Sequence, residues 1–288
     1  MILSMTGFAS VSAEWPGLAL TVELRSVNHR YLDLSLRIPD ELRLSEPAIR
    51  EKIAAELKRG KVDCRASLAR TAAGSASLAV DAGRVADVAR AGQEVARLVP
   101  GIAPLTTAEV LRWPGVIAEA TVPPEELAAR LLALLDQALA DLAASRAREG
   151  SKLDALLLAC CDGIDAQVKR VAPRVPAIQA AYMEKLGVKL REAGAEVVDE
   201  RLKQELALFA TKVDVAEEVA RLTTHVAEVR RVLKAGGAAG KRLDFLAQEL
   251  HREANTLGSK SVDAELSSVS LELKVLIEQM REQVQNVE

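Results

Sequence analysis

Alternating apolar and polar residues in the first 70 positions predict a small β-sheet. The alternation runs over residues 20–24 and 32–36, with a polar turn near Asn28 between them. "SEPAIREKIAAELKRG" then predicts a helix that is capped by Ser45 and stopped by Gly60. "KVDCRASLAR" returns to a strand, and "ILSMTGFASVSAEW" predicts a further one. We therefore expect a β-β-α-β unit with an additional N-terminal strand.

From about residue 80 the apolar positions recur at helical spacing. One helix is expected after Pro123 and Pro124, with its apolar face over residues 127–142, and a second long helical stretch is expected from Ser151. Pro173 and Pro176 should kink or divide that stretch. Extended helices of this kind favour an arm or coiled-coil-like packing, as is often used for oligomers.

The final 85 residues predict three amphipathic helices, over about 203–234, 241–257 and 264–288. A flexible turn, "KAGGAAGK", separates the first two. We thus expect an α+β protein that is mostly α. Its expected parts are a small N-terminal mixed β/α domain (1–75), a long helical region or arm (76–200) and a C-terminal helical domain (201–288) that carries the candidate site.

Composition narrows the class of protein only slightly. The content of hydrophobic (49%) and charged (27%) residues is ordinary for a soluble globular protein, and no run of about 18 apolar residues predicts a membrane span. Three cysteines without a disulfide framework suit the cytoplasm. A net charge of −3 without a basic tail argues against a general nucleic-acid binder, and the 2% of aromatic residues leaves few candidates for base stacking.

Polar residues flank the apolar faces of the last three helices. Glu218, Arg221 and His225 share one flank of the first helix, and Glu249 and Glu253 share one flank of the second. Like charges at i,i+4 repel unless a cation lies between them. Carboxylates with a histidine suit Mg²⁺ or Mn²⁺, and neighbouring arginines suit phosphate. The alternative is a solvated surface with i,i+4 ion pairs of about 0.2–0.5 kcal/mol each.

Several motifs resemble one family. These are "SMTGFAS", "ELRSVNHRYLDLSLRIP", "LKRGKVD", "RWPGV", "EEVARLTTH", "GKRLDFLAQELHREANTLGSKS" and "REQVQNVE". Together, and in this order, they are similar to the YicC/YloC family of bacterial proteins. The resemblance implies an endoribonuclease that needs a divalent metal and encloses RNA in a hexameric, clamshell-like assembly. His251 departs from the asparagine expected in the family motif, so no catalytic role is assigned to it.

The resemblance and the residue chemistry together suggest roles for individual side chains. The expected catalytic residues are His225, Glu249 and Glu253. The expected ligands of Mn²⁺ or Mg²⁺ are Glu217, Glu218, Asp244, Glu249 and Glu253. The expected RNA-binding residues are Arg25, Asn28, His29, Arg30, Arg221, Arg252, Lys260, Arg281 and Gln285. For His225, Asn28 and His29 a purely structural role remains open.

Two functions stay open at this point. The first is a metal-dependent cytoplasmic endoribonuclease working within an oligomeric clamp. The second is a non-catalytic oligomeric RNA-binding adaptor, whose carboxylates pair with arginines across subunit interfaces. Within the first, a metal-activated water would leave a 5′-phosphate, whereas attack by the RNA 2′-hydroxyl would leave a 2′,3′-cyclic phosphate.

Overall fold

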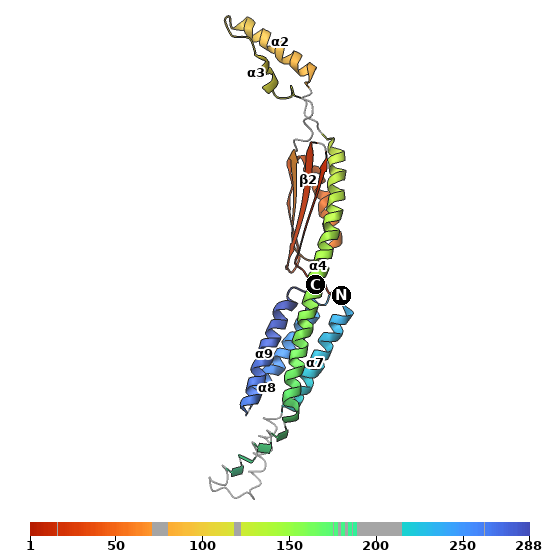
Figure 1. Cartoon of the computed structure of the whole chain (residues 1–288), viewed down its shortest axis with the longest axis vertical. Coiled ribbons are helices and arrows are strands. Elements are labelled where there is room, and N and C mark those ends of the chain that lie inside the picture. Colours follow the sequence, from red (N-terminus) through yellow and green to blue (C-terminus); the bar gives the residue numbers. More distant parts are fainter. Residues whose placement is uncertain are drawn as a thin grey trace.

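The computed structural model contains two apolar cores that lie one after the other along a single long helix (Figure 1). It describes residues 1–15, 17–70, 80–117, 122–174, 215–261 and 263–288, and scattered positions within 176–188. The order of elements confirms the expected class: a small sheet first, then long helices, mostly α overall. Part of the first C-terminal helix expected over 203–234 falls on residues outside the described ranges, up to 214.

A four-stranded sheet forms the N-terminal core. Strand β2 buries every second residue along most of its length, which follows directly from its alternating sequence. Its neighbours are antiparallel to it on both sides, whereas β3 pairs with β4 in parallel, and the sheet order is β1-β2-β4-β3. The expected β-β-α-β unit with an additional strand is confirmed. The strands are β1 (Gly7–Trp15), β2 (Leu18–Val27), β3 (Leu32–Arg37) and β4 (Gly60–Arg70).

The crossover between β3 and β4 contains the helix expected from its sequence, with one correction. Helix α1 (Glu46–Glu56) forms as expected, but the side chain of Ser45 makes no capping hydrogen bond. A short 3₁₀ helix, η1 (Asp40–Ser45), runs directly into α1, so Ser45 already has helical backbone angles (φ −84°, ψ −7°). A capping residue needs extended backbone, and the prediction of a Ser45 cap was therefore wrong.

Helix α4 (Pro124–Val171) is continuous over 48 residues, where the sequence pattern predicted two separate stretches. Its apolar face does not stop between them, because Arg146 and Gly150 are both buried and fall on the same face as Leu142 and Leu153. The helix ends at Val171 and passes into a 3₁₀ turn, η3 (Ala172–Arg174), so the expected interruption at Pro173 is confirmed. The N-terminal part of α4 packs on the sheet and the C-terminal part on the last three helices.

Residues from both ends of the chain meet α4 at the junction between the two cores (Figure 1). The guanidinium of Arg146 donates from Nε to the carbonyl oxygen of Ser4 over 2.7 Å and forms an ion pair with Glu288. Ser4 and Val287 form an isolated antiparallel bridge. A Cβ atom at Gly150 would overlap the carbonyl oxygen of Ile2, so the close approach of that segment requires glycine.

Replacing Gly150 with alanine should therefore lower the free energy of unfolding by about 1–3 kcal/mol, the usual cost of overpacking. On helix propensity alone, alanine would stabilise the helix, so a loss of stability would show that the steric overlap is the larger effect. Gly163→Ala on the same helix is the matched control, because its Cβ would lie 3.0 Å from the flexible Leu276 Cδ1 rather than against backbone. Urea unfolding of both variants measures the difference, and equal stabilities would contradict this account of the junction.

Three helices complete the second core around the C-terminal part of α4 (Figure 1). Their apolar residues face inward as expected. Gly236 and Gly237 both have positive φ, and they form the expected turn between the first two helices. No helix among the described residues is long and apolar enough to cross a membrane. The helices are α7 (Ala216–Ala235), α8 (Gly240–Ser259) and α9 (Ala264–Val284).

Two further helices, α2 (Ala82–Leu98) and α3 (Thr107–Arg112), lie beyond the end of the sheet that is remote from α7–α9 (Figure 1). Asp81 caps α2 by accepting a hydrogen bond from the backbone N–H of Arg84, and Thr106 caps α3 in a reciprocal capping box with Glu109. Between residues 80 and 117 only Val88 and Val116 are buried.

Candidate ion and phosphate site

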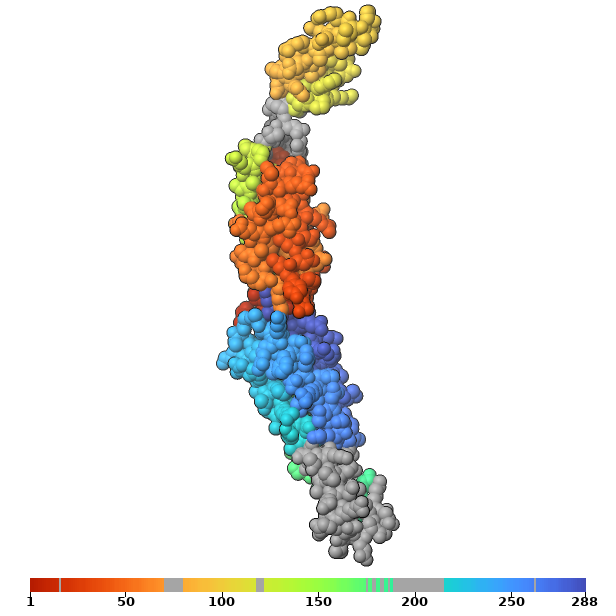
Figure 2. Space-filling model, turned by 180° about the vertical axis from the view of Figure 1, so that it is seen from behind, coloured from red at the N-terminus to blue at the C-terminus, as the bar shows by residue number. Residues whose placement is uncertain are grey.

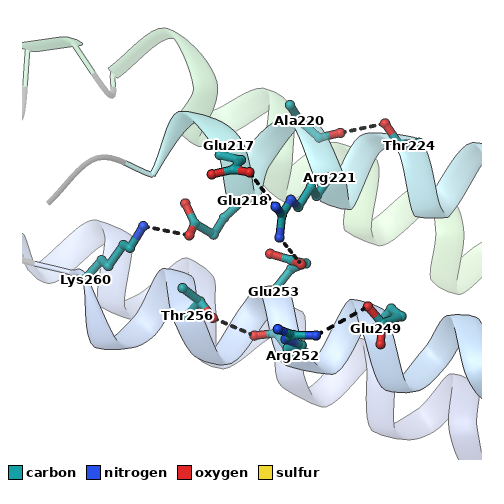
Figure 3. Close-up of polar contacts among 10 residues, drawn as sticks. All are labelled: Glu217, Glu218, Ala220, Arg221, Thr224, Glu249, Arg252, Glu253, Thr256 and Lys260. Carbon is teal, nitrogen blue, oxygen red and sulfur yellow. Dashed lines mark hydrogen bonds and ion pairs between the residues drawn. The ribbon is translucent and has the colours of Figure 1, made fainter. Parts of the chain in front are cut away.

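The candidate site lies along the border between α7 and α8, which form an antiparallel hairpin (Figure 3). Each helix buries its apolar face in the C-terminal core, and this orientation turns the adjacent polar flanks toward one another. Residues near the start of α7 therefore meet residues near the end of α8. The expected convergence of acids, one histidine and arginines at a helix border is what the structure shows.

Three expected catalytic residues come together on this border. His225, Glu249 and Glu253 each offer one ligand atom, and these atoms all lie within 4.8 Å of one another. Glu253 is only 3% exposed, whereas His225 and Glu249 are half-buried. A buried carboxylate beside a second carboxylate and an imidazole is an unfavourable arrangement unless a cation compensates it.

Arg221 supplies part of that compensation. Its Nη1 donates to Glu253 Oε1 over 3.3 Å, and its Nη2 donates to Glu217 one helical turn earlier (Figure 3). The hydrogen bond to Glu253 is the main reason that the pKa of the Arg221 guanidinium is raised. The Arg252 guanidinium lies 4.0 Å from Glu249 and is largely exposed. Two cations thus lie against the carboxylates, one on each helix.

Glu218 forms a second buried pair at the same end of the hairpin. Its side chain is 6% exposed, and its Oε1 accepts a hydrogen bond from Lys260 Nζ over 2.8 Å (Figure 3). Its other oxygen, Oε2, is buried without a hydrogen-bond partner among the described residues. Glu218 is therefore near the cluster but is held by a lysine.

Toward the other end of the hairpin, Glu228 connects the two helices. It accepts hydrogen bonds from Arg231 on its own helix and, over 3.3 Å, from Arg242 Nη2 on α8. The bond from Arg231, supported by that from Arg242, holds the pKa of Glu228 at about 2. The carboxylate is thus fully ionised at neutral pH, and it fixes the position of Arg242 beside the border.

The remaining expected site residues lie apart from the cluster. Asp244 accepts a hydrogen bond from Gln248 on the opposite flank of α8, and Arg281 lies 3.8 Å from Glu278 on α9. Asn28 donates to the carbonyl oxygen of Gln285 over 2.7 Å. That contact is at the end of the helices where α8 begins, and Glu253 is 13 residues further along α8, or about 20 Å.

Residues of the turn after β2 contact one another, as expected if they stabilise the turn. His29 Nδ1 lies 2.9 Å from the carbonyl oxygen of Tyr31, and the Arg30 guanidinium stacks 5.2 Å from the Tyr31 ring. Arg25 is exposed on the face of the sheet opposite α4. RNA contact by these residues stays a prediction, as it does for Arg281 and Gln285.

Phe245 is an exposed aromatic residue near the cluster that is not among the candidate residues predicted from the sequence. It lies on α8 one turn before Glu249 and is 50% exposed, away from the buried face of the helix. The sequence does contain a signal for it. Leu243 and Leu246 face the core, and at 100° per residue Phe245 points to the polar side of the helix, where a large aromatic residue is unusual.

Known proteins are similar to this chain over its N-terminal and C-terminal parts. The family model "Endoribonuclease YicC-like, N-terminal region" matches residues 2–155, and "Endoribonuclease YicC-like, C-terminal" matches residues 171–288. The chain is 38% identical over 288 residues to a protein of Haemophilus influenzae named probable endoribonuclease YicC, with both chains covered completely. It is 29% identical over 296 residues to a protein of the same name from Clostridioides difficile, again over both full lengths. The chain belongs to the YicC-like endoribonuclease family.

Proposed function

We propose that this protein is a divalent-metal-dependent endoribonuclease whose ion site is formed by His225, Glu249 and Glu253. The observation that carries the proposal is the meeting of these three side chains beside Arg221 and Arg252. Carboxylates and imidazole suit the ion, and guanidinium groups suit the phosphates of the substrate. The names of the relatives supply the substrate class, RNA.

The residues present fit an ion such as Mn²⁺ or Mg²⁺. Two carboxylates and one imidazole are hard or borderline donors, and the 4.8 Å spread of their ligand atoms is only slightly wider than the about 4.2 Å across an octahedral Mg²⁺ ion. The Arg221 guanidinium is itself a cation bound to Glu253, which indicates that this carboxylate attracts positive charge. When bound, the ion would neutralise phosphate charge and acidify a coordinated water.

The neighbouring side chains would position the RNA. Arg221 and Arg252 flank the carboxylates and would contact phosphate oxygens on either side of the cleaved bond. His225 is half-buried and would hold the ion through one ring nitrogen, which leaves that nitrogen unable to move a proton at the same time. Lys260 would act chiefly by holding Glu218 in place, since its amine already donates to that buried carboxylate.

The arginine partners of the carboxylates can be compared with those that the adaptor hypothesis predicts. That hypothesis places their arginine partners across subunit interfaces. Here Glu253 pairs with Arg221, Glu217 with Arg221, and Glu228 with Arg231 and Arg242, all within one chain. These arginine partners lie within one chain, which differs from the pairing across subunit interfaces that the adaptor hypothesis predicts.

The test is cleavage of an end-labelled structured RNA by the purified protein with Mn²⁺, Mg²⁺ or EDTA. The proposal predicts cleavage that requires an ion and leaves 5′-phosphate ends. Cleavage that persists in EDTA and leaves 2′,3′-cyclic phosphate ends would contradict the ion site while keeping the ribonuclease. RNA that is bound but never cut would favour the adaptor.

We also propose that the chain self-associates through the α2–α3 segment, residues 80–117. Among its residues only Val88 and Val116 are buried, whereas eight of its large apolar side chains are exposed. Figure 2 shows the segment at one end of the molecule, apart from the sheet. Segments of below about 40 residues seldom stay folded without further packing, so this surface needs a cover. The exposed residues are Val80, Val95, Leu98, Val99, Ile102, Leu105, Leu111 and Trp113.

A second copy of the same segment suits this surface. Four of these side chains, Val95, Ile102, Leu105 and Trp113, line a groove of about 550 Å³ between the two helices. The segment carries four arginines and four acidic residues, so its net charge is zero. Two copies therefore do not repel each other, and the segment has no excess positive charge that would attract RNA. Such contacts would contribute to the oligomeric clamp that the family resemblance implies, with six copies, in the cytoplasm.

The double variant Val95→Gln/Ile102→Gln should weaken self-association at least tenfold, because each side chain would lose roughly 1.5 kcal/mol or more of apolar burial. Light scattering over a range of concentrations measures the mass against the 30.9 kDa of one chain. Leu44→Gln is the control, since Leu44 is a large apolar residue that is 92% exposed elsewhere. A wild-type monomer, or an unchanged assembly in the double variant, would contradict the proposal.

A further inference from the structure

Phe245 is an exposed aromatic side chain that the core does not use. The residues of α8 that face the core include Leu243, Leu246 and Leu250, whereas half of Phe245 is open to solvent. Single exposed apolar residues are common and need no explanation by themselves. The position of this one beside the candidate ion site makes it informative.

The Phe245 ring lies between two positive groups along the border of α7 and α8. Glu249 follows it by one helical turn, about 6 Å along the axis on the same side of the helix. The Arg242 guanidinium lies over the ring, 5.7 Å from its centroid, and donates a hydrogen bond to Glu228 over 3.3 Å, so the other face of the ring is the one that a base could cover. Arg252 lies beyond Glu249 on the same side. The ring thus contacts one guanidinium, and a second lies about two helical turns further along the same side of α8; both groups suit phosphates.

From this geometry we infer that Phe245 stacks against an unpaired nucleobase adjacent to the phosphate that is cut. The inference rests on the proposed function. Base–aromatic stacking needs a base that is free of a duplex, because paired bases expose only their edges. Phe245 would therefore direct cleavage to single-stranded positions of the RNA, with little preference among the four bases, since every base has a π-face.

If Phe245 stacks on one base, part of the affinity for RNA depends on both the Phe245 ring and that base. In a Glu253→Gln background, which should bind RNA without cutting it, Phe245→Leu should weaken binding of a short single-stranded RNA by about fivefold to a hundredfold. Phe245→Trp should retain or strengthen binding. Phe8→Leu is the matched control, because Phe8 is 56% exposed on β1, away from α7 and α8.

The decisive probe is a set of RNAs in which one abasic nucleotide occupies each position in turn. One position should weaken binding to the protein with Phe245, and the same substitution should add little in Phe245→Leu, since both remove the same contact. The inference is overturned if the penalties simply add, if Phe245→Leu binds as tightly as its parent, or if light scattering shows that Phe245→Leu lowers the assembly mass. Failure of the parent to bind any RNA would overturn the proposed function itself.

Discussion

Glu253→Gln should lower the rate of RNA cleavage by at least about a hundredfold while the protein stays folded. Glu253 is 3% exposed and lies where His225 and Glu249 also present ligand atoms. Glutamine has the same shape but no charge, so it would bind a divalent ion far more weakly. Its amide oxygen can still accept the hydrogen bond from Arg221, which should preserve the α7–α8 contact. Single-turnover cleavage with saturating protein measures the effect without a contribution from RNA binding.

Glu51→Gln provides the matched control for this variant. Glu51 is an exposed glutamate on α1, on the N-terminal core, and its replacement should leave cleavage unchanged. Wild-type rates for Glu253→Gln would remove this carboxylate from the ion site. A loss of cleavage accompanied by unfolding would assign Glu253 a structural role instead.

Lys260→Met should lower the free energy of unfolding by about 1–3 kcal/mol, the usual cost of leaving a buried polar group without its hydrogen-bond partner. The Lys260 amine donates to Glu218 over 2.8 Å, and the Glu218 side chain is 6% exposed. Methionine keeps most of the length of the side chain but leaves an uncompensated carboxylate among apolar residues of α7 and α8. Urea unfolding followed by circular dichroism measures the loss.

A double variant separates the pair from other contacts of Lys260. Adding Glu218→Gln to Lys260→Met removes the buried charge, so it should restore much of the lost stability. If the two changes destabilised independently, their effects would add, and the pair would not account for the stability of this end of the hairpin.

Much of the fold follows from local pattern. The alternation around Val22 specifies strands that bury one face, and the polar turn at Asn28 ends β2 where the pattern changes. The helical spacing in the last third places Glu218, Arg221 and His225 on the flank that meets α8. These expectations held because one buried face determines the orientation of each element.

The features that sequence did not predict depend on contacts between distant residues. Arg146 interrupts the apolar pattern of α4, yet it is buried because Ser4 and Glu288 satisfy it. Ser45 matches a capping residue by type, but the preceding 3₁₀ helix determines its backbone angles. The pairing of Lys260 with Glu218 likewise depends on how α7 and α8 lie against each other, which no periodicity specifies.

We propose that His225, Glu249 and Glu253 hold one divalent ion. Anomalous diffraction from crystals of the full chain grown with Mn²⁺ tests it most directly. We expect one strong peak per chain, about 2–2.3 Å from the imidazole nitrogen and from an oxygen of each carboxylate. The peak should vanish in Glu253→Gln. An active protein with no peak at these three residues, or with its Mn²⁺ bound elsewhere, would rule out this ion site.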